Sequence, residues 1–237
     1  MTAPVRRRAA DVWTELVAVA VAVLCSWAAA PGTVGGPERA VFGAVNGWPD
    51  AWERPLWVVQ LVGVLGMPLL VAVVAAALRL WRLALALALL PPLKLLVHGE
   101  LIKGLVQRER PGSTIPGAIL RDVPSAGVAY PSGHAVIAAG IVVLLAPYVR
   151  RRWLVVLVAL ALLNAAARVY LGAHAPLDVV GGAAAGAAIG ALLNLAVGVA
   201  PRSAGGVSCA GPRRRRSGRA PGRRARPEPP PSDRARS

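Results

Sequence analysis

Residues 177–199 read LDVVGGAAAGAAIGALLNLAVGV, an apolar run interrupted only by Asp178 and Asn194. A helix needs about 20 apolar residues to cross the hydrocarbon layer of a membrane. A helix of this length on a soluble protein would carry a polar face, and two polar side chains are too few to make one. The run therefore predicts a membrane-spanning helix.

Comparable runs recur along the chain, which is 56% hydrophobic and only 16% charged. This balance is far from that of an ordinary soluble domain. The fourth run is short, and no internal repeat accompanies the set. We expect an all-α polytopic membrane protein built as a six-helix transmembrane bundle. The expected spans are Val12–Ala30, Leu56–Leu78, Leu83–Leu105, His134–Val149, Trp153–Tyr170 and Leu177–Val199.

Positive charge gathers in four places, each beside one end of an expected span. Lys and Arg near span ends favour the cytoplasmic side of a membrane. If both termini lie in the cytoplasm, all four clusters lie there too, whereas the opposite orientation would place all four outside. We therefore expect a multi-pass protein of the cell (plasma) membrane with both termini cytoplasmic. The clusters are Arg6–Arg8, Arg79 with Arg82, Arg150–Arg152 and the arginines from Arg202 onward.

The end of the chain is its most basic part. Residues 202–237 hold eleven arginines against Glu228 and Asp233, within a net charge of +16 for the whole chain. The segment is rich in Pro, Gly and Ser, so we expect residues 201–237 to form a disordered cytoplasmic tail. A basic tail beside a span favours binding to anionic lipid headgroups rather than to nucleic acid. Residues 1–11 are expected to be a short basic cytoplasmic segment, and 12–200 the six-span domain.

The first apolar run has two interpretations. It follows Arg6–Arg8 and ends in Ala28–Ala30, which is also the pattern of a secretory signal with a cleavage site. A cytoplasmic N-terminus needs a retained first span, so we expect it to be retained. The two cysteines, Cys25 and Cys209, lie in this run and in the tail, and neither has the spacing of a metal ligand. No disulfide between them is expected.

The topology leaves three extracytoplasmic segments, and the residues able to do chemistry concentrate there and at the adjoining span ends. In the second segment, Lys103 and Arg110 are seven residues apart and Pro111 follows. On a continuous helix, seven residues would place both cations on one face. The simpler alternative is a lysine that reaches up to the lipid headgroups. The segments are Pro31–Pro55, Val106–Gly133 and Leu171–Pro176.

A second group is Pro131-Ser132-Gly133-His134, directly before an apolar run. Ser132 is placed to cap a helix, and Gly133 allows an anion to approach the backbone. The free N–H groups and the dipole at a helix start bind anions, although the same pattern also begins ordinary helices.

A third group is Arg168, His174 and Asp178. Gly172 is placed to turn the chain, and Pro176 suits the first turn of a helix. Residues four apart meet across one helical turn, which would bring Asp178 to the ring of His174. A carboxylate on one imidazole nitrogen leaves the other as nucleophile or base. Such a cluster at a membrane boundary indicates a functional site.

Together these segments resemble the signature of the type 2 phosphatidic acid phosphatase superfamily, the lipid phosphate phosphatases. The family pattern is Lys, six residues, Arg-Pro; then Pro-Ser-Gly-His; then Ser-Arg, five residues, His, three residues, Asp. Every spacing within the three motifs matches, over the third to sixth expected spans. One difference is Ala167, where the family usually has Ser, which removes one hydrogen bond to phosphate but no nucleophile or acid.

The resemblance implies a phosphatase domain with a role for each matched residue. His174 would attack phosphorus and form a phosphohistidine, oriented by Asp178. His134 would protonate the leaving group and then activate water. No metal and no cofactor is expected, because the chain has no acidic cluster to hold magnesium and protein groups would neutralise the phosphate. The expected phosphate-binding residues are Lys103, Arg110, Ser132, Gly133 and Arg168.

Alternatives remain at the level of substrate and of function class. Polyprenyl diphosphate is the favoured lipid, by analogy with small bacterial members of the family, with phosphatidylglycerol phosphate and phosphatidic acid as alternatives. A non-catalytic lipid-phosphate binder or transporter would not need two imidazoles and an aspartate. Vanadium haloperoxidases have a similar site but are soluble and larger. The pattern leaves the lipid tail and the oligomeric state open. It assigns no role to Lys94, and His98 and Glu100 fit either a polar pair between helices or the lining of the site.

Overall fold

The computed structural model describes residues 7–199, so the predicted tail and the first residues of the basic N-terminal segment lie outside the described residues. Over the described range the chain is helical, with an isolated bridge between Glu109 and Val128 and no strand. The all-α prediction is confirmed for this range. The elements are α1 Ala9–Ala29, α2 Gly36–Asn46, η1 Asp50–Trp52, α3 Glu53–Val59, η2 Gln60–Gly63, α4 Met67–Ala77, α5 Trp81–Lys94, the π-helix η3 Leu95–Ile102, α6 Lys103–Leu105, α7 Pro111–Thr114, α8 Gly133–Leu145, α9 Arg151–Tyr170 and α10 Pro176–Val197.

Within residues 7–199, four helical stretches are long and apolar enough to cross a membrane: α1, the continuous run Trp81–Leu105, α9 and α10. A fifth crossing is possible if Asp50–Gly63 and Met67–Ala77, which meet at a 61° bend, count as one broken span. The helix α8 is apolar but shorter, at 13 residues. The protein is therefore a multi-pass membrane protein, while the count of six spans stays a prediction.

The second expected span, Leu56–Leu78, is not one continuous helix but is broken by a 61° bend. The helix tightens to a 3₁₀ turn at η2 and becomes extended at Val64 before α4 begins. Pro68 is the physical reason, since a proline ring clashes with the carbonyl four residues earlier, which belongs to Val64. The break brings Gly63 against the start of α8, where a Cβ on Gly63 would lie 2.6 Å from the carbonyl oxygen of His134.

The centre of the bundle is the pair α8 and α10, which approach closely because glycines line their contact. A Cβ on Gly186 would lie 2.1 Å from the carbonyl oxygen of Val136, and one on Gly190 would lie 3.0 Å from that of Gly140. Small residues allow membrane helices to pack backbone against backbone. This contact fixes the two helices whose first turns carry His134 and Asp178.

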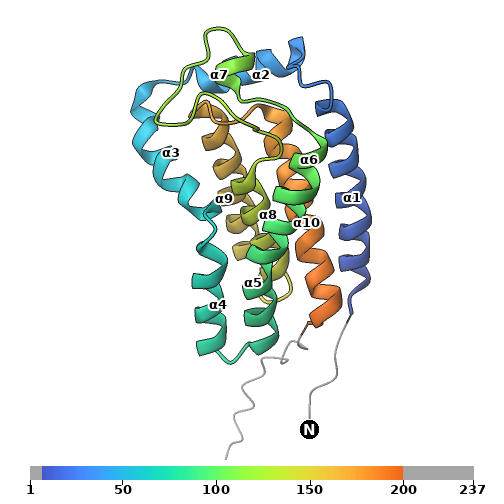
Figure 1. Ribbon diagram of the computed structural model, residues 1–237. Helices are drawn as coiled ribbons and strands as arrows, with labels where there is room; N and C mark the ends of the chain where they lie inside the picture. The colour runs from blue at the N-terminus through green and yellow to red at the C-terminus, as the bar shows by residue number, and fades with distance from the viewer. Residues whose placement is uncertain (1–6, 200–237) are drawn as a thin grey trace, which may run out of the picture. The chain divides into compact units, whose positions relative to one another are not determined.

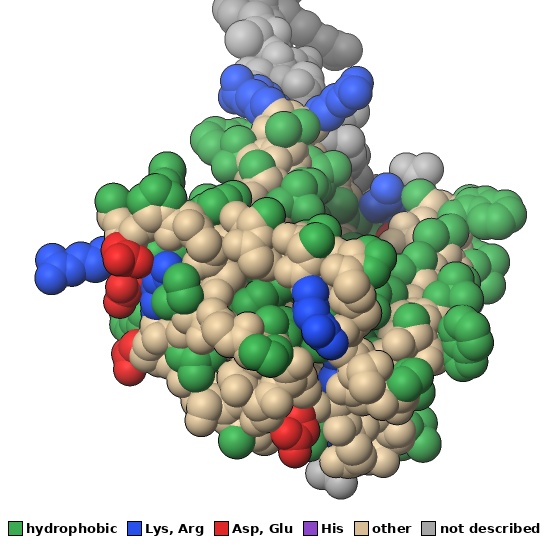
Figure 2. All heavy atoms as spheres, turned by 90° about the horizontal axis from the view of Figure 1, so that it is seen from above, with side chains coloured by type: hydrophobic (Ala, Val, Ile, Leu, Met, Phe, Trp, Pro, Cys, Tyr) green, Lys and Arg blue, Asp and Glu red, His purple; other side chains and the backbone are tan. Residues whose placement is uncertain are grey.

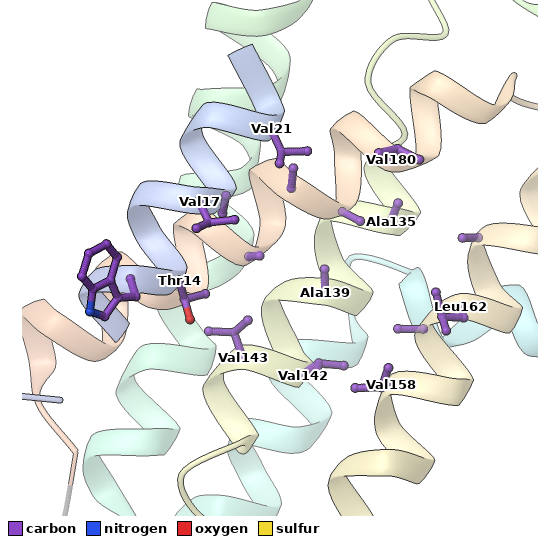
Figure 3. Close-up of a pocket in the computed structure, with 17 residues that line it drawn as sticks. Thr14, Val17, Val21, Ala135, Ala139, Val142, Val143, Val158, Leu162 and Val180 are labelled. Carbon is purple, nitrogen blue, oxygen red and sulfur yellow. The ribbon is translucent and has the colours of Figure 1, made fainter. Parts of the chain in front are cut away.

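Figure 1 shows that the start of α1, the turn between α4 and α5 and the end of α10 lie at one end of the bundle, while α2 and α7 lie at the other. We call these the basic end, after Arg79 in the α4–α5 turn and Arg82 at the start of α5, and the site end. A mainly apolar groove of about 690 Å³ opens between α1 and α9 over the surfaces of α8 and α10 (Figure 3). It runs from Ala135, the residue after His134, down to Val143 and Val158.

Candidate active site

The third predicted group folds around the turn between α9 and α10. Gly172 adopts φ +79°, which favours glycine, and Pro176 begins α10, both as expected. The Nδ1 atom of His174 lies 3.8 Å from Oδ2 of Asp178, and both side chains are buried. This distance is longer than a hydrogen bond. Oδ2 of Asp178 accepts instead from the backbone N–H of Ala175 at 2.8 Å. Catalytic contacts often tighten only when substrate binds.

The surroundings of His174 favour its neutral form. Burial is the largest cause of a pKa held well below the ordinary value of 6.5, and the charges of Arg168, Arg110 and Lys103 act in the same direction. Contact with the Ala129 backbone opposes these effects only in part. A neutral imidazole next to three cations has a free lone pair in a place that attracts anions.

A partly buried carboxylate outside the three motifs supports Asp178. Oε2 of Glu38, in α2, accepts a hydrogen bond of 2.5 Å from Arg108, and Oε1 accepts from the N–H of Leu177 at 2.8 Å. The Arg108 guanidinium is fully buried and also lies 3.4 Å from Oδ1 of Asp178. The sequence patterns gave no role to Arg108, which lies in the second extracytoplasmic segment, and did not indicate Glu38. The only sign of Glu38 in the sequence was an acidic residue in an outer segment, and this does not indicate which residue it contacts.

The second predicted group begins α8, as expected. Ser132 takes the extended backbone of an N-cap, but its hydroxyl makes no capping hydrogen bond. Its Oγ is buried and has no hydrogen-bond partner among residues 7–199. The Ser132 N–H donates to the carbonyl oxygen of Asp178 at 2.8 Å, which ties the start of α8 to the start of α10. A helix start with an unpartnered hydroxyl and a glycine is suited to bind an anion.

The first predicted group does not lie on one helix, and that prediction is wrong. Helix α6 ends at Leu105, and Val106 is extended. Residues 108–110 form backbone hydrogen bonds with 127–129 instead, and a residue before proline, here Arg110, disfavours helix. Arg110 still reaches the site, because its NH1 donates to the carbonyl oxygen of Ala173 at 3.0 Å. Burial lowers the pKa of Arg110, with Asp178 acting in the opposite direction.

Arg168 is held by a residue that the motifs do not contain. Its NH1 donates to Oε1 of Gln60 in the broken span, while Nδ2 of Asn164 donates to the Gln60 carbonyl oxygen at 3.0 Å. The Arg168 Nε has no hydrogen-bond partner within the described range. The sequence patterns did not indicate Gln60, although a polar side chain inside an apolar stretch is a sign of a functional role. Ala167, the residue before Arg168, is fully buried.

The structure thus brings the three motifs to one end of the bundle, with His174, Asp178, Arg110 and the start of α8 linked directly. Figure 2 views this site end: charged side chains are scattered over it and no histidine is visible, in keeping with the burial of His174. Over residues 7–199, no group of three or more His, Cys, Asp or Glu is placed to hold a metal ion. Cys25 is buried and unpaired, while Cys209 lies outside the described residues.

Comparisons with known proteins identify a family and a fold. The model of the PAP2 superfamily matches residues 79–201. Two solved structures have a similar fold. A transmembrane PAP2 type phosphatidylglycerolphosphate phosphatase from Bacillus subtilis is 18% identical, with a TM-score of 0.63 over 77% of this chain and 94% of that one. LpxE of Aquifex aeolicus is 21% identical, with a TM-score of 0.56 over 65% of this chain and 92% of that one. No curated protein matches the sequence.

Proposed function

The chain belongs to the PAP2 superfamily, and from this premise we propose that it hydrolyses a lipid phosphate or diphosphate without a metal, through a phosphohistidine intermediate. The observation that carries the proposal is the buried pair His174 and Asp178. Nδ1 of His174 lies 3.8 Å from Oδ2 of Asp178, and nearby cations face the imidazole. In this arrangement Nδ1 faces the carboxylate and Nε2 is the nucleophile.

The first step forms a bond from Nε2 of His174 to phosphorus and breaks the bond from phosphorus to the leaving oxygen. The electron pair of that bond stays on the leaving oxygen, and His134 supplies its proton. Phosphoryl transfer needs in-line positioning and charge stabilisation above all. Arg110 and Arg168 offer forked donors to the nonbridging oxygens, and Lys103 offers a point charge. The start of α8, with Ser132 and Gly133, adds backbone N–H groups.

The second step returns the enzyme to its first state. His134, now neutral, acts as a base and takes a proton from water, and the water oxygen attacks phosphorus. The bond from phosphorus to Nε2 of His174 breaks, and its electron pair returns to the imidazole ring. Orthophosphate leaves. Asp178 holds the ring in both steps, and Arg108 with Glu38 holds Asp178. A non-catalytic binder would need the cations but not this pairing of histidine with a buried carboxylate.

A lipid substrate is favoured by the setting of the site. The helices that carry it are apolar on their outer faces, and the apolar groove begins at Ala135, one residue from His134. We place the site end outside the plasma membrane and both termini in the cytoplasm, because Arg79, Arg82 and Arg150–Arg152 lie in or directly beside the α4–α5 and α8–α9 turns, which then face inward. In the same topology the tail lies against anionic headgroups.

Polyprenyl diphosphate is our first candidate for the lipid, and phosphatidylglycerol phosphate is the second. The second is favoured by one observation, the similarity in fold to a Bacillus subtilis protein described as a phosphatidylglycerolphosphate phosphatase. A likeness in fold alone does not determine a substrate.

The test is phosphate release by the purified full-length protein in detergent with EDTA present. Polyprenyl diphosphate, phosphatidylglycerol phosphate and phosphatidic acid are compared at equal surface concentration. We expect release from at least one of them, inhibition by vanadate, and no release by His174→Ala. Arg82→Met is the control, since Arg82 lies at the start of α5, at the basic end, and has no part in the proposed chemistry. Equal release by wild type and His174→Ala would exclude the covalent mechanism, and full loss of activity in EDTA would exclude the metal-free one.

A further inference from the structure

Lys94, which the three motifs leave without a role, lies against the first residue of α8. A Cβ on Gly133 would be only 3.2 Å from both Cε and Nζ of Lys94, and 3.4 Å from Nε2 of His98. The absence of a side chain at Gly133 is therefore what leaves space for the ammonium group. The next residue is His134, which we assign to the leaving group.

Lys94 lies deep within an apolar helical run that is long enough to cross the membrane. It is the last residue of α5, 13 residues after Trp81, which places it about 20 Å from the basic end at 1.5 Å per residue. From there the side chain cannot reach water at that end. Among the side chains that the structure describes, which exclude Glu100, none forms a hydrogen bond or ion pair with the Lys94 ammonium. An ionisable side chain at such a depth marks a path for ions or substrates.

The cations of the site form two levels. Lys103 and Arg110 lie toward the loops at the site end, where Arg110 contacts Ala173 beside the nucleophile. Lys94 precedes Lys103 by nine residues on the same helical run, so it lies deeper and faces the start of α8 from the membrane side. A lipid chain must leave the site toward the membrane interior. The group bonded to that chain is therefore the one nearest Lys94.

We propose that Lys94 binds the phosphate next to the lipid chain of a diphosphate substrate, and so selects lipid diphosphates over lipid monophosphates. This inference rests on the proposed phosphatase function. A monophosphate releases an alcohol, which carries no charge after protonation by His134. A diphosphate releases a lipid monophosphate, whose oxygens remain anionic and need a cation in a region of low dielectric constant.

The step balances within the same mechanism. His174 attacks the terminal phosphorus, the bond from that phosphorus to the bridging oxygen breaks, and the electron pair remains with the lipid monophosphate. Lys94 pairs with the nonbridging oxygens of this leaving group, and His134 delivers a proton to the former bridging oxygen. Water then releases orthophosphate from His174, as in the general scheme.

The experiment compares a prenyl diphosphate with the prenyl monophosphate of the same chain length, using the full-length protein in detergent. For Lys94→Met we expect the ratio of kcat/KM for diphosphate to that for monophosphate to fall about 10- to 100-fold, the usual effect of losing one charge-assisted hydrogen bond. Arg82→Met, which removes a cation from the other end of α5, should leave this ratio unchanged. Lys94→Arg should restore part of it.

An unchanged ratio in an active Lys94→Met protein would overturn the role of Lys94 and leave the phosphatase assignment intact. An equal fall for both substrates would overturn it too, because that result indicates a structural lysine. No hydrolysis of either prenyl substrate by the wild type would overturn the role of Lys94 and the choice of polyprenyl diphosphate, and the phosphatase proposal would then be tested by release from phosphatidylglycerol phosphate and phosphatidic acid. If Lys94→Met does not fold, the wild type supplies the test. Methylene diphosphonate should inhibit hydrolysis of the prenyl monophosphate at least about tenfold more strongly than orthophosphate does. Equal inhibition by the two compounds would contradict the inference.

Discussion

The contact between Glu38 and Arg108 allows a sharp test of how the site is held together. We consider Glu38→Gln, which keeps the shape of the side chain and its acceptor for the Leu177 N–H but removes the charge. Arg108 is fully buried, and its other carboxylate, that of Asp178, lies 3.4 Å away against 2.5 Å for Glu38. The substitution therefore removes the shorter of the two ion pairs of a guanidinium that has no access to water.

The magnitude follows from that geometry. A hydrogen bond to a charged group contributes about 1.5–3 kcal/mol, and breaking a buried ion pair outright costs about 3–5 kcal/mol. Because Asp178 still faces Arg108, we expect the lower value, a loss of about 2 kcal/mol in the free energy of unfolding. In a protein of this size that corresponds to a fall in Tm of about 4–8 °C. Turnover should also fall, because Arg108 then draws Asp178 away from His174.

The assay is thermal unfolding in detergent together with kcat on the preferred lipid. Asp50→Asn is the matched control, since Asp50 pairs with Arg121 at 3.0 Å but its side chain is 86% exposed. An exposed pair contributes about 0–1 kcal/mol, so the control should change Tm by at most half as much and leave kcat unchanged. If Glu38→Gln behaved like Asp50→Asn in both measurements, the reasoning about the buried network would be refuted.

Three further predictions concern the nucleophile and the packing beneath it. Burial and neighbouring cations lower the pKa of His174, so the nucleophile stays neutral until the pH falls well below 6.5. Formation of the phosphoenzyme, measured by rapid quench, should therefore persist at pH 6. A loss of phosphoenzyme formation with its midpoint at pH 6.5 or above would contradict this. Asp178→Asn should lower kcat by leaving the imidazole poorly oriented, and a wild-type rate would make Asp178 merely structural. Gly186→Ala should destabilise the protein by more than about 2 kcal/mol, because its Cβ would meet the Val136 carbonyl. Gly43→Ala, where a Cβ meets nothing within 4 Å, should be neutral or stabilising, and equal Tm values for the two would contradict the packing account.

The sequence predicted the membrane helices because hydropathy depends only on composition along the chain. It could not predict the break at Val64, although Pro68 was visible, because prolines also occur within intact spans: Pro91 and Pro92 lie inside α5. Neighbouring helices decide whether the chain breaks at a proline. The continuous helix from Lys103 to Arg110 failed for a related reason, since long-range pairing with residues 127–129 replaced it.

The sequence could nominate the candidate site residues because motif spacing places them at the ends of helices. Their supports were not found, because Glu38 and Gln60 lie 70 and 108 residues from the arginines that they hold. Nothing in the local pattern around a carboxylate or an amide indicates such a partner. Lys94 is intermediate: its charge inside an apolar run was visible, but its contact with the start of α8 depends on the packing of α5 against α8.

The central claim is the covalent bond between phosphorus and His174, and trapping it is the most direct measurement. The full-length protein is mixed with a lipid substrate labelled in its terminal phosphate, quenched within one turnover, and digested for mass spectrometry. We predict a phosphoryl group on the peptide that contains His174, absent from His174→Ala and increased when His134→Ala slows the attack of water. A wild-type enzyme that releases phosphate but never carries the label on His174 would contradict the account.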